Sequence, residues 1–120
     1  VDTDFCLRAR KAGHAVAVAA SARLLHRRGA KQPARAAGRT WWPAHMPPAR
    51  LFLLFRNRLV LFRRHGIAFP HWACFELAYG LKILGEILAF EEQKSARLAA
   101  CLRGTWHGLL GRSGPPAPRK

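Results

Sequence analysis

Acidic residues are scarce in this sequence. Only six Asp and Glu stand against 21 Lys and Arg, so the formal net charge is +15 at pH 7 with His neutral. Such a charge attracts polyanions, including nucleic acid, anionic lipid headgroups and phosphorylated substrates, and it does not choose among them. Because 50% of the 120 residues are hydrophobic, a disordered basic tail is excluded.

Paired cysteines and long apolar runs are lacking as well. Cys6, Cys74 and Cys101 lie far apart, and no Cys/His spacing favours a zinc site. Reduced thiols in a cytoplasmic protein are the simplest interpretation. No basic-apolar-small signal segment opens the chain, and no run approaches the roughly 20 apolar residues that span a bilayer. Charged residues interrupt every candidate: Arg56, Arg58, Lys82 and Glu86.

Asp2 and Asp4 are the only acidic residues before Glu76. Two carboxylates so isolated among basic residues are hard to explain as ordinary surface. One interpretation is a helix N-cap followed by a first-turn aspartate, both favoured at a helix start. The other is that one of the two carboxylates carries out chemistry.

The first third of the chain predicts a short helix, two short strands and a loop. Residues 2–12 predict a short helix that Gly13 ends in a left-handed conformation. Residues 14–20 and 23–26 predict two short strands joined by a turn, although the alanines of the first also fit a helix. Residues 27–43 predict a loop, since glycines and prolines recur there.

Three longer helices are predicted after this loop. The first covers residues 49–65, begins at Pro47-Pro48 and ends at Gly66. The second runs from residue 71 to about 93, and the third covers residues 96–110 with Ser95 as its N-cap. Residues 112–120 predict a disordered tail.

Hydrophobic periodicity predicts which faces of these helices are buried. The first helix has one apolar stripe, which indicates core packing, with its arginines elsewhere: Phe52, Phe55, Leu59 and Phe62. The second is apolar on more than one side, and its charged residues predict the wet face: Glu76, Lys82, Glu86 and Glu91. The third has an apolar stripe in register: Leu98, Leu102, Trp106 and Leu109.

The motif order resembles a known family. The chain reads Asp-Thr-Asp-Phe-Cys-Leu-Arg at residues 2–8, then Gly13, then His26, then Phe-Arg-Asn-Arg at residues 55–58, then Arg-Gly-Thr-Trp-His-Gly-Leu at residues 103–109. This order resembles the C-terminal part of a family 2 glycosyltransferase with the GT-A fold. It is most similar to the rhamnosyltransferase-like subset, and Val1 before the first aspartate fits that subset.

The resemblance implies roles for individual residues. It makes Asp2 the catalytic base, with Asp4 and Arg8 supporting the motif on the acceptor side. It makes His26 a ligand of the divalent metal, Mg²⁺ or Mn²⁺, on the donor diphosphate in the complete enzyme. Arg56 and Asn57 match an Arg-Asn pair on the helix that follows the catalytic domain.

The chemistry of such a transfer agrees with these residue types. Inversion needs a carboxylate within hydrogen-bond reach of the acceptor hydroxyl. The leaving nucleoside diphosphate needs its charge neutralised by a metal and cations, and a neutral imidazole is a suitable metal ligand. Arg27 and Arg28 could contact the diphosphate, although loop arginines are more often solvated. Without the motif, His26 would be taken as a packed or surface histidine.

The resemblance also implies what is missing. GT-A enzymes bind the nucleotide on an N-terminal αβ unit whose Asp-x-Asp motif holds the metal, and this chain has no such unit. Residues 1–43 then correspond to the C-terminal segment of the catalytic domain, 44–111 to a helical region and 112–120 to the tail. We expect an α/β fragment that is mostly helical as it stands, the C-terminal fragment of a longer protein, and inactive alone.

Two functions remain open at this stage. The first is part of an enzyme of polysaccharide or cell-wall biosynthesis. It would move a sugar, with rhamnose a candidate, from a nucleotide-sugar donor to a cell-surface polysaccharide or lipid-linked acceptor. The second is a basic helical module that binds nucleic acid or anionic membrane. Nucleic-acid motifs are absent, so we do not expect nucleic acid as a partner.

Membrane association is expected from the helices and tryptophans. The helices of residues 49–110 carry apolar stripes beside arginines, which suits docking on an anionic membrane at the inner face of the cell membrane without crossing it. Trp41 and Trp42 fit a membrane interface, a stacking surface or simple packing. The alternative is that these helices cover the missing domain or pair in a dimer.

Overall fold

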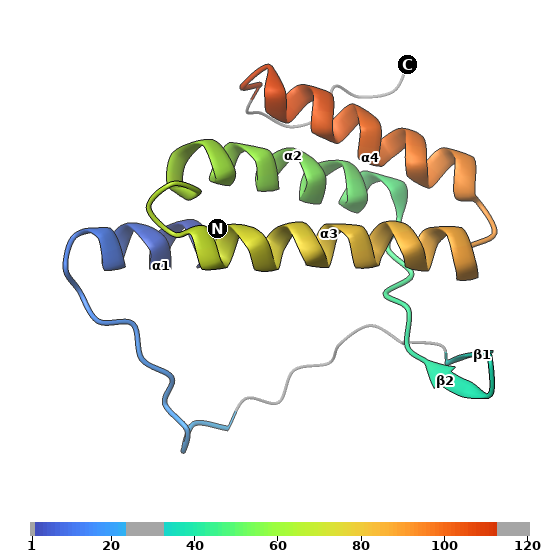
Figure 1. Ribbon diagram of the computed structural model, residues 1–120, viewed down its shortest axis with the longest axis horizontal. Coiled ribbons are helices and arrows are strands. Elements are labelled where there is room, and N and C mark those ends of the chain that lie inside the picture. The colour runs from blue at the N-terminus through green and yellow to red at the C-terminus, as the bar shows by residue number, and fades with distance from the viewer. Residues whose placement is uncertain (1, 24–32, 113–120) are drawn as a thin grey trace. The chain divides into compact units, whose positions relative to one another are not determined.

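The computed structural model describes residues 2–23 and 33–112, which belong to two compact units, residues 1–31 (unit 1) and residues 32–120 (unit 2). The described residues form four helices and one antiparallel pair of short strands (Figure 1). The prediction of a mostly helical chain is therefore confirmed at this level, whereas the strand pair lies at other residues than those predicted. Its identification with part of a GT-A domain, and the predicted domain boundaries, stay predictions.

Unit 1 contains helix α1, Asp2–Lys11, close to the range predicted. Its first turn is acidic and its last turn basic, which is the favourable arrangement for the helix dipole. The helix ends at Gly13, whose φ is +86°. The Gly13 amide donates to the carbonyl of Arg10 at 3.1 Å and the His14 amide to that of Ala9 at 3.0 Å. The left-handed glycine thus satisfies carbonyls that the helix end leaves open.

The strand predicted for residues 14–20 is wrong. This stretch has no regular structure, and Val16 and Val18 are 48% and 92% exposed. A strand needs a neighbour to complete its hydrogen bonds, and no described residue pairs with this stretch. The second strand, predicted for residues 23–26, lies outside the described residues from position 24 onward.

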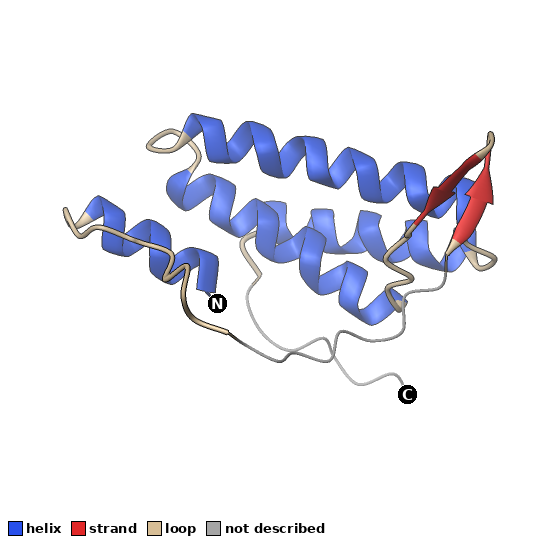
Figure 2. Cartoon of the chain, turned by 90° about the horizontal axis from the view of Figure 1, so that it is seen from below, coloured by secondary structure: helices blue, strands red, loops and turns tan. Residues whose placement is uncertain are grey.

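The loop predicted for residues 27–43 contains a hairpin in its described part. Strand β1, Ala34–Ala36, pairs antiparallel with β2, Arg39–Trp41 (Figure 2). The connecting residues Ala37 and Gly38 have φ values of +50° and +70°. Two consecutive positive φ values define a tight turn whose twist matches the strands. Gly38 therefore marks a hairpin turn and not an irregular loop.

The three predicted helices of unit 2 are confirmed, with shifted ends. They are α2, Pro48–His65, α3, Pro70–Phe90, and α4, Lys94–Leu109. The first two begin on prolines, which suit a first helical position. The predicted cap is wrong, because Gln93 precedes α4 and Ser95 lies inside it. Within the described ranges, no helix is both long and apolar enough to cross a membrane.

Helix α4 packs directly on α2, and two glycines make this possible (Figure 1). A Cβ atom on Gly104 would lie 2.3 Å from the carbonyl oxygen of Phe52, and one on Gly108 would lie 2.8 Å from that of Arg56. No side chain fits at either distance. The backbones of the two helices therefore approach closely along the face of α4 that carries these glycines.

This contact reverses the predicted orientation of α4. The buried residues are small, namely Ala100, Cys101, Gly104 and Gly108. Three residues of the predicted apolar stripe point outward, with Leu102 70%, Trp106 60% and Leu109 54% exposed. The large side chains are excluded from the contact because the α2 backbone occupies the space they would need.

The wet face predicted for α3 is right for Lys82, which is exposed, and wrong for Glu91. Glu91 is buried, at 6% exposure, whereas large apolar side chains of α3 face out: Phe75, Leu77, Leu81 and Leu88. The carboxylates are drawn inward by cations of the neighbouring segments, as described below. The core of unit 2 joins all three helices: Leu51, Ile83, Ile87, Ala100 and Cys101.

Candidate functional site

The two isolated acids of the sequence lie in the first turn of α1 and differ in their surroundings. Asp4 forms an ion pair with Arg8, one turn later in the helix, with 3.2 Å between Oδ2 of Asp4 and Nε of Arg8. The Asp4 side chain is 23% exposed. Asp2 is exposed. The Asp4–Arg8 pair fixes one carboxylate along the helix, so Asp2 is the acid of this turn that presents its carboxylate to solvent.

The other predicted site residues are not brought to this turn by anything the structure describes. His26, Arg27 and Arg28 lie outside the described residues. Arg56 and Asn57 belong to α2, in unit 2. The structure thus groups Asp2, Asp4 and Arg8 on one short helix, and the roles of the other five predicted residues stay predictions.

The Arg56-Asn57 pair forms a local contact on α2. The Nε of Arg56 donates to Oδ1 of Asn57 at 3.1 Å, and its guanidinium carbon lies 5.7 Å from the centre of the Phe52 ring. Arg56 is only 9% exposed, although the sequence predicted the arginines of this helix away from the packed stripe. The pair therefore contributes to the packing of α2.

Arg58 is the most deeply placed arginine of this helix, with a side chain 6% exposed. Its Nε donates to Oε2 of Glu76 on α3 at 2.9 Å, and its guanidinium lies against the rings of Phe55 and Tyr79 at 5.5 and 5.6 Å. Gly80 leaves room for it, because a Cβ there would lie 2.6 Å from Nη1. The sequence did not predict this contact, because an arginine side chain is usually exposed at the protein surface.

Glu91 joins three segments just beyond the end of α3. Its Oε1 lies 3.2 Å from Nδ1 of His45, and its Oε2 lies 3.0 Å from Nη2 of Arg97. Arg97 also donates to the carbonyl of Met46. A buried carboxylate needs such partners, and here they fasten the segment before α2 to the first turns of α4. The backbone of His45 has a φ of +42°.

A pocket of about 440 Å³ lies beside this cluster. Mostly polar residues line it: Pro33, Ala34, His45, Phe90, Glu91, Glu92, Gln93 and Arg97. Its lining residues His45 and Arg97 both pair with Glu91, so this cluster is explained by its role in joining the three segments.

Cys101 is buried in the core of unit 2, at 2% exposure, and the three cysteines are free. Burial raises the pKa of its thiol above the ordinary value of 9.0. A thiol held protonated is a poor nucleophile. Cys101 is therefore a packing residue.

A metal site is not assembled by the described residues. In residues 2–23 and 33–112, no three His, Cys, Asp or Glu side chains come together so that they could hold a metal ion. The described acids and histidines alone do not fit the divalent metal that the family resemblance implies.

Comparison with known proteins gives no match at any level. No model of a protein family matches the chain, and neither does a curated protein or a solved structure. Any function must therefore be argued from the residues themselves.

Proposed function

We propose that this chain supplies the acceptor-side base and the C-terminal helices of an inverting glycosyltransferase. The donor would be a nucleotide sugar, with rhamnose a candidate sugar, and the acceptor a cell-surface polysaccharide or a lipid-linked glycan. The observation that carries the proposal is the first turn of α1. There Asp2 is exposed while its neighbour Asp4 is held by Arg8, and the motif around them resembles that of family 2 glycosyltransferases.

In the proposed reaction the carboxylate of Asp2 accepts the proton of the acceptor hydroxyl. The acceptor oxygen forms a bond to the anomeric carbon as the bond from that carbon to the diphosphate oxygen breaks, and the electron pair leaves with the nucleoside diphosphate. A general base of this kind contributes roughly 10²–10⁴-fold to the rate. The proposal needs a nucleotide-binding unit that the 120 residues do not contain, and no step here is assigned to a metal.

The ion pair of Asp4 separates the roles of the two acids. A base must exchange protons with a substrate, so its carboxylate has to be accessible, as that of Asp2 is. Asp4 is positioned to orient the turn through Arg8. The two aspartates, two residues apart on one helix, therefore form a matched pair for a test.

The test compares Asp2→Asn with Asp4→Asn in the complete enzyme. Asp2→Asn should lower turnover by about 10²–10⁴-fold, because the amide cannot accept the proton, while calorimetry shows unchanged donor binding. Asp4→Asn loses a surface ion pair of small energy and should stay within about tenfold of the parent. Near-parental turnover of Asp2→Asn would exclude Asp2 as the base.

A further inference from the structure

The outward face of α4 combines large apolar side chains with arginines. Leu102, Trp106, Leu109 and Leu110 are 70%, 60%, 54% and 47% exposed. Steps of four, three and one residue place them within one arc of the helix. Three exposed arginines surround this arc: Arg63, Arg103 and Arg112. These seven residues are called the α4 face below.

The direction of the α4 face is fixed by the packing behind it. Gly104 and Gly108 lie on the opposite side of the helix, against the α2 backbone. Rotating α4 to bury its leucines would drive larger side chains into the carbonyls of Phe52 and Arg56. The leucines therefore cannot turn inward, and the α4 face is a permanent surface of unit 2.

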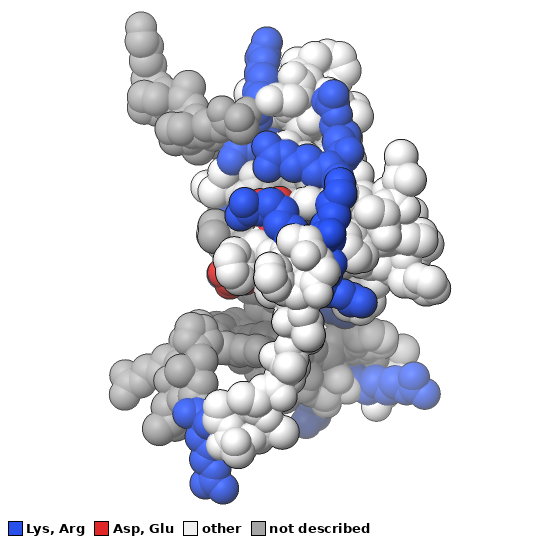
Figure 3. Space-filling view, turned by 90° about the vertical axis from the view of Figure 1, so that its left-hand side faces the viewer, with Lys and Arg blue, Asp and Glu red and all other residues white. Residues whose placement is uncertain are grey.

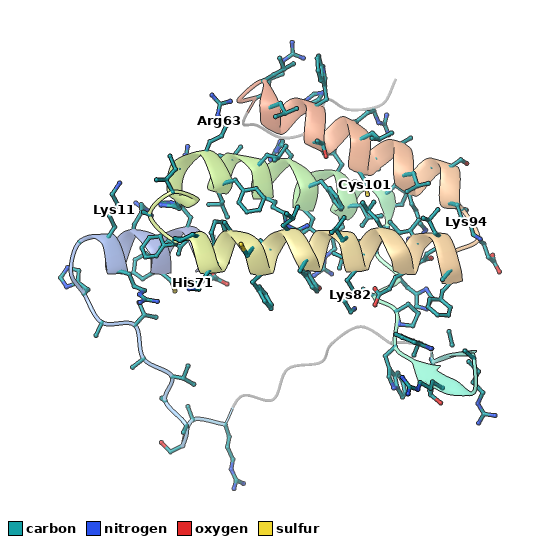
Figure 4. All side chains as sticks on the ribbon, in the orientation of Figure 1. Lys11, Arg63, His71, Lys82, Lys94 and Cys101 are labelled. Atoms are coloured by element: carbon teal, nitrogen blue, oxygen red, sulfur yellow. The ribbon has the colours of Figure 1, made fainter. Side chains whose placement is uncertain are left out.

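An arginine from α2 hydrogen-bonds to the C-terminal end of α4, beside the α4 face. The Nη1 of Arg63, from the end of α2, donates to the carbonyl of Leu109 at 2.8 Å (Figure 4). Figure 3 shows one face of the described residues, where the charged side chains at the surface are mostly those of Lys and Arg. Neither α2 nor α4 contains an Asp or Glu; the acids of unit 2 lie on α3 and just after it.

We propose that the α4 face docks on an anionic lipid surface, with α4 lying in the plane of the interface. Leucine and tryptophan side chains on one arc insert at the boundary of headgroups and acyl chains, and the arginines reach the lipid phosphates. Tryptophan suits this depth because its ring is apolar and its N–H polar. This inference does not depend on the proposed sugar transfer.

Charge and chemistry disfavour the other occupants. A second copy of the same face would bring its arginines against their counterparts, with no acid on α2 or α4 to pair with them. Nucleic acid would satisfy the arginines and could stack on Trp106. It would leave the three leucines in contact with phosphate and water, where their burial gains nothing.

The test is co-sedimentation of the 120-residue chain with vesicles. Vesicles of phosphatidylcholine alone are compared with vesicles that also contain phosphatidylglycerol. Binding should require phosphatidylglycerol and should weaken between 0.1 M and 1 M salt, because the Debye length falls from about 10 Å to about 3 Å. Equal binding to both vesicles at low salt would overturn the proposal.

Paired glutamine variants assign the binding to one face. Leu102→Gln with Leu109→Gln should weaken binding at least about tenfold, because a glutamine side chain does not gain the transfer free energy that a leucine gains on leaving water. The matched control is Leu81→Gln with Leu88→Gln on α3, where the leucines are 62% and 56% exposed, and it should bind as the parent does. Both pairs should keep the parental circular dichroism, since glutamine favours helix.

Three outcomes would overturn the assignment. The first is an equal loss of binding in both variant pairs. The second is a dimer, seen by light scattering without lipid, that the α4 pair dissociates; this would assign the face to a second copy. The third is saturable binding of single-stranded RNA without binding to anionic vesicles.

Discussion

Glu91 joins parts of unit 2 that lie far apart in the sequence. One carboxylate pairs with His45 before α2 and with Arg97 in α4. Removing a buried acid in such a cluster leaves its cations without their partner, which costs more than the pair itself contributes. The strained backbone of His45, with φ at +42°, is retained because this contact and the adjoining packing hold it.

The variant Glu91→Ala should therefore lower the free energy of unfolding by about 2–3 kcal/mol. The control is Glu92→Ala, the next residue, whose side chain is exposed and which should stay within about 0.5 kcal/mol of the parent. Urea unfolding followed by circular dichroism measures both. Equal effects of the two substitutions would show that Glu91 acts only through its charge.

At the scale of elements, the glycines of α3 and α4 look alike in sequence and differ in structure. Gly85 of α3 is exposed with nothing within 4 Å of its Cβ position, whereas Gly104 of α4 faces the Phe52 carbonyl at 2.3 Å. Alanine at Gly85 gains helix propensity at no steric cost. Alanine at Gly104 must push two backbones apart.

We expect Gly85→Ala to raise the free energy of unfolding by about 0.5–1 kcal/mol and Gly104→Ala to lower it by about 1–3 kcal/mol. If α2 and α4 pack as described, the two substitutions change the free energy of unfolding in opposite directions. Thermal or urea unfolding measures both changes. Stabilisation by both substitutions would contradict that packing.

The same elements show how far the sequence predicts the fold. Prolines at helix starts, Gly13 and the helical periodicity located the helices, because these signals are local. The buried faces of α3 and α4 were not predictable from hydrophobicity alone. Two glycines decided the orientation of α4. Arg58 holds Glu76 of α3, and His45 and Arg97 hold Glu91 just after it, all from other segments. Such long-range pairings leave no local pattern.

The candidate site was predictable only in part, for a related reason. The isolation of Asp2 and Asp4 among basic residues singled out the first turn of α1, and the structure distinguishes the two through Arg8. Sequence reasoning could not show that Arg56 and Arg58 are buried, since a buried arginine depends on rings and acids that the fold supplies.

At the scale of the molecule, the reactivity of the Cys101 thiol indicates whether the helices of unit 2 are packed together. Cys101 sits in the core shared by the three helices and burial raises the pKa of its thiol, so the thiol is held protonated and its direct reaction is suppressed. Cys74 on α3 is exposed. A thiol reagent should therefore reach Cys101 only when the helices separate.

A chain whose single cysteine is Cys101 (Cys6→Ala, Cys74→Ala) should react with maleimide at least about a hundredfold more slowly than a chain that retains only Cys74. The two rates should become equal in denaturant. Rapid labelling of Cys101 in the folded chain would mean that α4 detaches readily from α2 and α3.

The pairing of α2 with α4, which α3 separates in the sequence, also restricts the order of events during synthesis. Helix α2 leaves the ribosome well before Gly104 and Gly108 do, and no other described segment offers its backbone so close a fit. In the interval, the face of α2 that α4 will cover is open to chaperones and to neighbouring nascent chains. A chain stalled after α3 should therefore remain sensitive to protease along α2, and protection should appear abruptly once α4 has emerged.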